Sequence, residues 1–291
     1  MVFGDKKMWE NKGKHLLTAL IAIVVVGVVM ASGCIDFGGQ KEVKTVVVTG
    51  SSTVLPIASL CAEAFNAKQD AVRVTVSGGG SGHGVKSVAT GEADIGMASR
   101  EVKQNEITEF GDNFVDHIVA YDAVVMIVSK QIYDSGVTNL TIEQVRGIYN
   151  GMITNWNEVG GPDKNIYVVA RKTGSGTYHT FMEFVFGSDT SEAPGTDTEC
   201  GENAEVKTAV AGSDKAIGYV GLGYVSSSTP GMALNGVSAS ADTVKNGDYP
   251  ISRSLHMYTW GEPNKPTQEF LDFVLGPEGQ QIVEDEGFIL L

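Results

Sequence analysis

The chain has 291 residues, of which 42% are hydrophobic and 36 are glycine, and its formal net charge is −14. This length suffices for one large domain or two ordinary ones with a packed core, and the glycines indicate many tight turns. Because nucleic acids are bound by basic surfaces, the acidic charge argues against a nucleic-acid partner, and any anion must be held by local groups.

The first 33 residues have the pattern of an export signal. Four lysines precede an apolar run at 16–30, and small residues lead from there to Cys34. This run is short for a membrane span and typical of a secretory signal. The Ala-Ser-Gly-Cys ending resembles a lipobox, so Cys34 is the predicted lipidation site, at the start of a tether over residues 34–44. An uncleaved N-terminal anchor is the alternative, and both interpretations place the remainder at the outer face of the cytoplasmic membrane, in a periplasmic or extracellular compartment.

The next part of the chain alternates strands and helices. We expect β-branched strands at 45–49, 72–77 and 93–99, a helix at 56–68, and a second helix that ends at about residue 90. Strands that alternate with helices predict an α/β fold with largely parallel sheets.

The same alternation returns after a continuous apolar strand at 119–128. The expected elements are a helix from Thr141 to Tyr149 that opens with a capping box, a strand at 166–170, a helix at 178–186, a polar loop at 188–201, a helix at 202–211, a strand at 217–220, an irregular stretch from about 226, and closing helices at 267–275 and 277–286. This order predicts two α/β lobes with the ligand between them, because ligands of α/β sheets bind at the carboxyl ends of the strands.

Two further cysteines remain in the exported part. Cys61 lies in an apolar helical pattern, whereas Cys200 lies in the predicted polar loop. We expect both thiols to be unpaired, with Cys61 in the core.

Three turns share one composition, and each follows a strand and opens a helix. They are Gly50–Thr53, Ser77–Gly82 and Gly174–Thr177. A helix N-terminus presents unpaired N–H groups with partial positive charge, and glycine allows a ligand to approach the backbone closely. Hydroxyl donors are supplied by Ser52, Thr53, Ser81, Ser175 and Thr177. One such turn is weak evidence for an anion site, whereas three in one chain favour it.

Two arginines accompany these turns. Arg171 precedes Gly174 by three residues, and Arg100 ends the third strand tract. A guanidinium group presents a planar fork of donors that matches a tetrahedral oxyanion. We therefore expect both arginines to bind the anion, against the alternative of surface ion pairs.

The sequence lacks the motifs expected for nucleotide binding, for a catalytic serine and for a metal site. The Gly-Lys-Ser/Thr spacing of a nucleotide-binding loop fails at Lys86, and no serine has glycine at both −2 and +2. The histidines form no i, i+4 pair and no cluster with cysteine, so we expect no metal site, no cofactor and no catalytic residues.

The ordered motifs resemble the substrate-binding protein of the phosphate ABC transporter, a family with a two-lobed periplasmic-binding fold of type II. The resemblance covers about residues 44–291, and its motifs are Gly50–Pro56, Ser77–Gly84, Ala93–Arg100, Ile153–Trp156, Arg171–Thr177 and Glu286–Ile289.

The resemblance implies a monomeric, non-enzymatic receptor that delivers inorganic phosphate to a permease and its ATPase. It implies phosphate contacts from Thr53, Val54, Ser81, Arg171, Ser175, Gly176 and Thr177. It also implies hinge crossings near 120–126 and 220–228. We therefore assign residues 45–122 and 227–291 to lobe 1 and residues 123–226 to lobe 2.

One position departs from the family pattern. Many relatives have an aspartate where this chain has Arg100, and that aspartate accepts a hydrogen bond from protonated phosphate. A carboxylate acceptor excludes fully ionised sulfate, because sulfate has no proton to donate. Asp122 is the candidate acceptor in this chain, and a structural role at the hinge is the alternative. A receptor for sulfate, molybdate or tungstate, an exported phosphoryl-transfer or hydrolytic enzyme, and a phosphate sensor or adhesin remain alternatives for the function.

Overall fold

The structure is a computed structural model that describes residues 43–189 and 191–291. The predicted export signal and Cys34 lie outside these residues. Within the described ranges, no helix has the length and the apolar character needed to cross a membrane.

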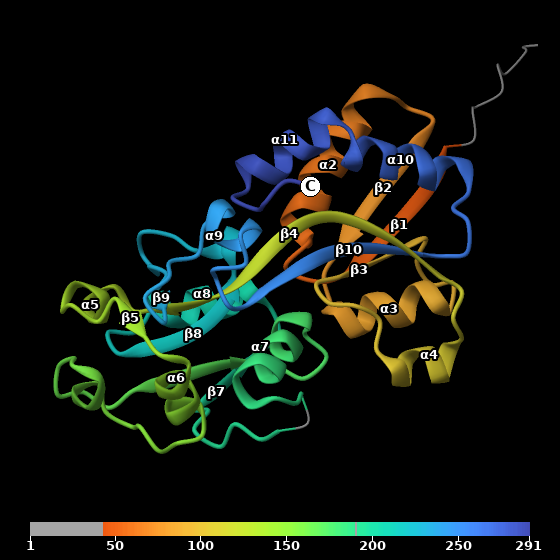
Figure 1. Cartoon of the computed structure of the whole chain (residues 1–291). Coiled ribbons are helices and arrows are strands. Elements are labelled where there is room, and N and C mark those ends of the chain that lie inside the picture. Colours follow the sequence, from red (N-terminus) through yellow and green to blue (C-terminus); the bar gives the residue numbers. More distant parts are fainter. Residues whose placement is uncertain (1–42, 190) are drawn as a thin grey trace, which may run out of the picture. The chain divides into compact units, whose positions relative to one another are not determined.

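The chain folds into alternating strands and helices (Figure 1). In order, the elements are β1 (Lys44–Gly50), α2 (Leu55–Lys68), β2 (Val72–Ser77), α3 (Ser81–Ala89), β3 (Ile95–Ala98), α4 (Gln104–Phe110), β4 (Phe114–Val128), α5 (Lys130–Asp134), β5 (Asn139–Leu140), α6 (Ile142–Tyr149), η1 (Trp156–Val159), β6 (Tyr167–Arg171), α7 (Gly176–Phe186), β7 (Thr198–Cys200), α8 (Asn203–Ala211), β8 (Ala216–Gly221), η2 (Leu222–Tyr224), β9 (Ala233–Leu234), α9 (Ala241–Lys245), β10 (Ser252–Trp260), α10 (Lys265–Leu275) and α11 (Pro277–Asp285).

Over the described residues, eight strands form one continuous sheet in the order β2-β1-β3-β10-β4-β8-β6-β7. The flanks are parallel, as the alternation predicted: β1 pairs with β2 and β3, and β6 pairs with β7 and β8. The centre is antiparallel, because β10 runs against both β3 and β4, and β4 runs against β8. Figure 1 shows β4 and β10 side by side along the middle of the molecule. The expectation of largely parallel sheets is therefore wrong for the central strands.

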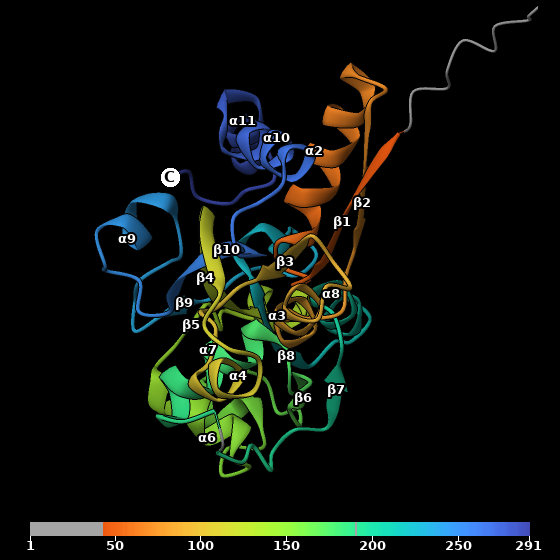
Figure 2. The ribbon, with the colours of Figure 1, turned by 90° about the vertical axis from the view of Figure 1, so that its right-hand side faces the viewer.

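Among the described residues, the two largest of four hydrophobic clusters lie along this sheet, and we call them the first and the second core. The first core contains Val48, Ile57, Met97, Leu255 and Phe270. Its covering helices α2, α10 and α11 contact one another and gather on one side of the strands (Figure 2). Packing of α2 on β1 and β2, and of α10 on β1 and β4, buries the apolar faces of these two helices.

The second core forms around β6, β8, α6 and α7, and it contains Val124, Tyr149, Trp156, Phe181 and Tyr219. The ring planes of Phe181 and Tyr219 stack with centroids 3.9 Å apart. Residues of the 232–251 segment also pack in this core. The residue boundaries assigned to the two lobes remain a prediction.

The strand β4 joins the cores. It places Val119 and Ala120 in the first core and Ala123 and Val124 in the second. Asp122 lies between these pairs and is completely buried. The segments that cross between the cores therefore meet beside a buried carboxylate.

Gly50 at the end of β1 shows why a glycine turn is needed there. Its φ is +133°, and a Cβ atom at this position would lie 2.3 Å from the carbonyl oxygen of Met97. No L side chain fits such an approach, so the turn that follows β1 depends on glycine.

Two details differ from the sequence analysis, and one agrees with it. The predicted polar loop at 188–201 contains the short strand β7, and the predicted irregular stretch contains α9 and β10. Among the residues that the structure describes, Cys61 and Cys200 are both free and buried, as expected for the two thiols.

Candidate functional site

The first turn places three hydroxyl groups at the start of α2. Ser51, Ser52 and Thr53 are each at most 4% exposed. The Ser51 hydroxyl accepts hydrogen bonds from the backbone N–H groups of Thr53 and Val54, at 3.2 and 3.4 Å. The turn is thus held rigid by its own side chain, with Ser52 and Thr53 directed to other partners.

The turn before α7 meets the first turn from the side of the second core. The hydroxyl oxygens of Thr53 and Thr177 lie 3.1 Å apart. Ser175 caps α7 by accepting a hydrogen bond from the Tyr178 N–H at 3.2 Å. The N-termini of two helices therefore converge on one buried point, which favours negative charge there.

The second turn completes the convergence. Ser81 opens α3, is fully buried, and accepts a hydrogen bond from the Ser99 N–H at 3.0 Å. The Gly82 N–H donates to the Gly174 carbonyl at 3.0 Å. A Cβ on Gly176 would lie 2.3 Å from the Ser81 hydroxyl oxygen. All three predicted turns are therefore in contact.

Arg171, at the end of β6, is 1% exposed and joins both sides of the site. Its Nη1 donates to Asn203 Oδ1 at 2.7 Å, and its Nη2 donates to Ser52 Oγ at 3.0 Å and to the Gly201 carbonyl at 2.6 Å. Burial lowers the pKa of Arg171 to about 10, and the nearby Tyr219 and Glu202 oppose this shift. The guanidinium group nevertheless carries its charge at neutral pH.

Asn203 was missed by the sequence analysis. It opens α8, is fully buried, and donates from Nδ2 to the hydroxyls of Thr53 and Ser52, at 2.8 and 3.2 Å. A polar side chain that follows a strand and begins a helix is the local signal that could have identified it.

Arg100 is buried beside the site, but its fork is engaged elsewhere. Its Nη1 and Nη2 donate to the Glu106 carboxylate of α4, at 2.8 and 2.6 Å, and Nη1 also donates to the Glu101 carbonyl. Nη2 lies 3.7 Å from where a Cβ on Gly82 would be. The structure therefore places Arg100 against the second turn, in an ion pair with Glu106.

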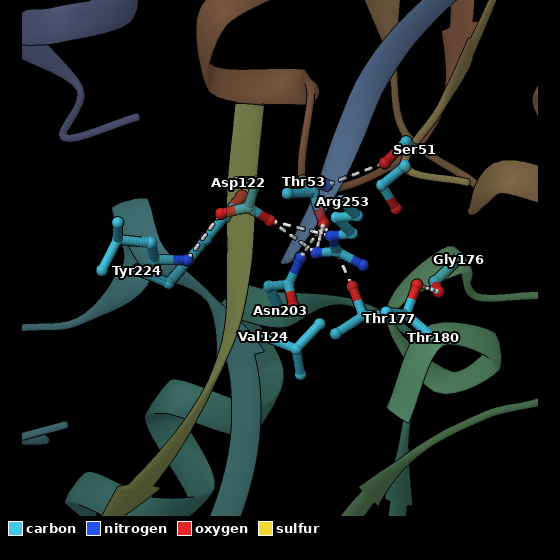
Figure 3. Close-up of polar contacts among 12 residues, drawn as sticks. Ser51, Thr53, Asp122, Val124, Gly176, Thr177, Thr180, Asn203, Tyr224 and Arg253 are labelled. Carbon is cyan, nitrogen blue, oxygen red and sulfur yellow. Dashed lines mark hydrogen bonds and ion pairs between the residues drawn. The ribbon is translucent and has the colours of Figure 1, made fainter. Parts of the chain in front are cut away.

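Asp122 contacts a residue that the sequence analysis did not single out. Its Oδ2 accepts from Nε and Nη2 of Arg253, at 2.9 and 2.7 Å, and its Oδ1 accepts from the Leu222 N–H at 2.8 Å. Nη2 of Arg253 also donates to the Thr53 hydroxyl at 3.2 Å. Figure 3 shows the guanidinium group of Arg253 between Asp122 and the threonines.

Three guanidinium nitrogens around these turns are buried without a hydrogen-bond partner among the described residues: Arg100 Nε, Arg171 Nε and Arg253 Nη1. Buried N–H donors in proteins are nearly always paired, and unpaired cationic donors are costly. Beside converging hydroxyls and helix N-termini, such donors suit an anion that has several oxygens. Over the same residues, no three His, Cys, Asp or Glu side chains gather as a metal site.

A cleft of about 740 Å³ opens beside the site and is lined by residues that include Arg100, Lys103, His179, Asp189 and Arg253. Across it, Lys103 before α4 forms an ion pair with Asp189 after α7, and His179 Nδ1 lies 2.8 Å from the same carboxylate oxygen. We call Lys103, Asp189 and His179 the clasp. It joins the two sides of the cleft away from the buried hydroxyls.

A family model described as the PBP superfamily domain matches residues 37–278. The two-core α/β fold and the buried site between the cores thus define a two-lobed solute-binding protein of this superfamily.

Similarity to individual proteins shows which family of this superfamily the chain belongs to. The chain is 32% identical to the phosphate-binding protein PstS of Bacillus subtilis, over 87% of this chain and 82% of the relative, and 31% identical to PstS of Staphylococcus saprophyticus, over 98% and 91%. A crystal structure of a Clostridium perfringens protein with bound phosphate, described as a candidate substrate-binding protein of a phosphate ABC transporter, is 34% identical, with a TM-score of 0.78 and coverage of 85% and 100%. The chain belongs to the PstS family of phosphate-binding proteins.

Proposed function

We propose that this protein captures inorganic phosphate outside the cytoplasm and delivers it to an ABC importer. The observation that carries the proposal is a set of three buried guanidinium nitrogens that have no partner in the described part of the chain and lie beside hydroxyls from three converging turns. These groups are donors with positive charge, and phosphate offers four oxygens with negative charge. The names of the PstS relatives and the phosphate in the Clostridium perfringens structure support the same ligand.

The proposed phosphate contacts come from turns on the sides of both cores. They are Ser52, Thr53, the backbone of Val54, Ser81, Arg171, Ser175, the backbone of Gly176, and Thr177. Arg100 is a further candidate, and Asp122 is a candidate through Arg253, whose guanidinium group it holds. Hydroxyls can donate to phosphate and also accept from its proton, so a site rich in hydroxyls suits a partly protonated anion. Arg171 supplies the charge-assisted contact through Nε, while its other nitrogens stay bound to Asn203 and Ser52.

Capture follows from the position of the site between two cores. A phosphate ion that contacts the first and third turns at once favours the closed arrangement, and its differential affinity for that arrangement shifts the population toward it. The clasp adds an ion pair that exists only when the two sides meet. The closed form is then the species that a permease recognises, and the protein transforms no substrate.

The remaining parts of the proposal concern the setting. We infer that the protein acts as a monomer, tethered through lipid on Cys34 or through an N-terminal anchor, and that its partners are a permease and an ATPase. The lobes are proposed as residues 45–122 with 227–291, and residues 123–226, except that the 232–251 segment packs with the second of these lobes.

Calorimetric titration of the full-length chain, dialysed free of anions, tests the function. We expect saturable binding of phosphate with one site and weaker binding of sulfate and molybdate. Tighter binding of sulfate than phosphate would assign the protein to another oxyanion. Hydrolysis of a chromogenic phosphoester would contradict a role in transport alone.

A further inference from the structure

Asp122 links three segments that pass between the two cores. It lies on β4 opposite Arg253 of β10 in the strand register, and it accepts the N–H of Leu222 directly after β8. Each segment changes from one core to the other near this point: Ile251 packs in the second core and Leu255 in the first, while Tyr219 packs in the second core and Tyr224 against the first. One buried carboxylate thus holds the crossings together.

Arg253 occupies the side of Asp122 that faces the proposed phosphate site. Its side chain is 4% exposed, and Nε and Nη2 are occupied by the carboxylate. Nη2 also reaches the Thr53 hydroxyl, which in turn lies 3.1 Å from that of Thr177. The guanidinium group therefore contacts the Thr53 hydroxyl, which in turn meets the Thr177 hydroxyl from the side of the second core (Figure 3).

The third nitrogen of Arg253 sets this residue apart from a purely structural ion pair. Nη1 is buried and has no partner within residues 43–189 and 191–291. Burial lowers the pKa of Arg253, and the neighbouring Asp122 raises it again, so the pair retains a charged guanidinium. A brace for the hinge needs only Nε and Nη2, whereas a buried cationic donor left over needs an acceptor.

We propose that Arg253 binds the phosphate directly through Nη1, as a second guanidinium besides Arg171, and that Asp122 is its positioning residue. This inference rests on the proposed function, since it concerns the same anion. The planar fork divides the two tasks: one edge is fixed by the carboxylate, and the remaining nitrogen is directed at the ligand. Asp122 then acts on the anion only through Arg253, and it ties the ligand contact to the three crossings.

The test is a calorimetric comparison of Arg253→Gln, Asp122→Asn and the double variant with the wild type, using inorganic phosphate and sulfate. Arg253→Gln should weaken phosphate binding by roughly 30- to 4,000-fold, the range for loss of one partner of a buried charge pair. Asp122→Asn should weaken phosphate and sulfate by the same factor. The double variant should bind no more weakly than Arg253→Gln, because both changes remove one contact. Arg73→Gln, on the exposed face of the edge strand β2, is the matched control and should bind as the wild type does.

The thermal midpoint of each variant, measured without phosphate, shows whether a loss of affinity comes from a lost ligand contact or from a destabilised fold. If Arg253→Gln does not fold, Arg253→Lys takes its place: it keeps the cation but replaces the fixed planar fork by a single nitrogen on a flexible stem, so at least a tenfold loss of affinity is expected. Phosphate affinity within threefold of the wild type in the folded Arg253 variant would reduce the residue to a brace and overturn the inference. A selective loss of phosphate over sulfate in Asp122→Asn would also overturn it, because Asp122 would then contact the ligand. Failure of the wild type to bind phosphate would instead refute the proposed function.

Discussion

The substitution Gly176→Ala should destabilise the closed, phosphate-bound form without destabilising the fold of the phosphate-free protein. Gly176 opens α7 on the side of the second core, and the new Cβ would lie 2.3 Å from Ser81 Oγ and 2.4 Å from Ser99 Oγ. Ser81 and Ser99 are at most 1% exposed, and the Ser81 hydroxyl forms hydrogen bonds with the hydroxyl and the backbone N–H of Ser99. Neither hydroxyl can therefore move aside freely. The φ of Gly176 is not positive, so alanine adds no backbone strain there.

The clash is more than 1 Å inside ordinary van der Waals contact, which is typical of overpacking that costs about 1–3 kcal/mol. The cost arises only where α7 meets α3 and the segment after β3, so it falls on closure. Phosphate affinity should decrease by roughly 5- to 150-fold, while the thermal midpoint without phosphate should stay near that of the wild type.

Calorimetry with phosphate and differential scanning calorimetry without it measure the two effects. Gly212→Ala at the end of α8 is the control, since its Cβ would approach no atom closer than 3.3 Å. Unchanged affinity in Gly176→Ala would refute the argument that this close approach belongs to the ligand-bound form.

Three further predictions concern separate features. Arg171→Met should weaken phosphate binding by roughly 30- to 4,000-fold in calorimetry; unchanged affinity would mean that the site lies elsewhere. Burial and Lys103 lower the pKa of His179, and Lys103 lowers that of Asp189, so the clasp stabilises the closed form at neutral pH and loses strength as pH falls below about 6.5. The thermal midpoint with saturating phosphate should therefore drop between pH 7 and pH 5 more in the wild type than in His179→Gln, and equal slopes would contradict this. In denaturant, a thiol reagent should titrate two cysteines in membrane-extracted protein if Cys34 is lipidated, and three would contradict lipidation.

The sequence predicted the elements whose own residues determine them. The β-branched segment Val72–Ser77 forms β2 with those bounds. The capping box at α6 is present, with Thr141 Oγ1 accepting from the Gln144 N–H and the Gln144 side chain accepting from the Thr141 N–H. Local hydrogen bonds and strand propensity act within a few residues, so one sequence suffices to find them.

The strand β10 shows what local patterns cannot predict. Its polar residues include His256 and Thr259, which are buried, and Arg253, whose side chain is 4% exposed. Their burial is possible because acceptors that are remote in sequence pair with their donors. Asp122 accepts hydrogen bonds from Arg253, and Asp116 accepts one from His256 Nδ1. Burial of polar groups depends on such partners, and they become visible only when the chain is folded.

Contacts between residues remote in sequence also limited how much of the candidate site could be predicted. Turn composition singled out Thr53, Ser81, Arg171 and Thr177, and the folded chain brings their turns into contact, while their role in phosphate binding remains a prediction. Arg253 stands in no such turn. Its contacts with the site arise from strand pairing across more than a hundred residues, which composition and spacing do not report.

A crystal structure of the full-length protein grown with phosphate tests the central claim most directly. The account predicts one phosphate between the starts of α2, α3 and α7, in hydrogen-bond contact with the Thr53, Ser81 and Thr177 hydroxyls, Arg171 Nε and Arg253 Nη1. Phosphate bound elsewhere in the cleft, with these donors turned to protein partners, would contradict it.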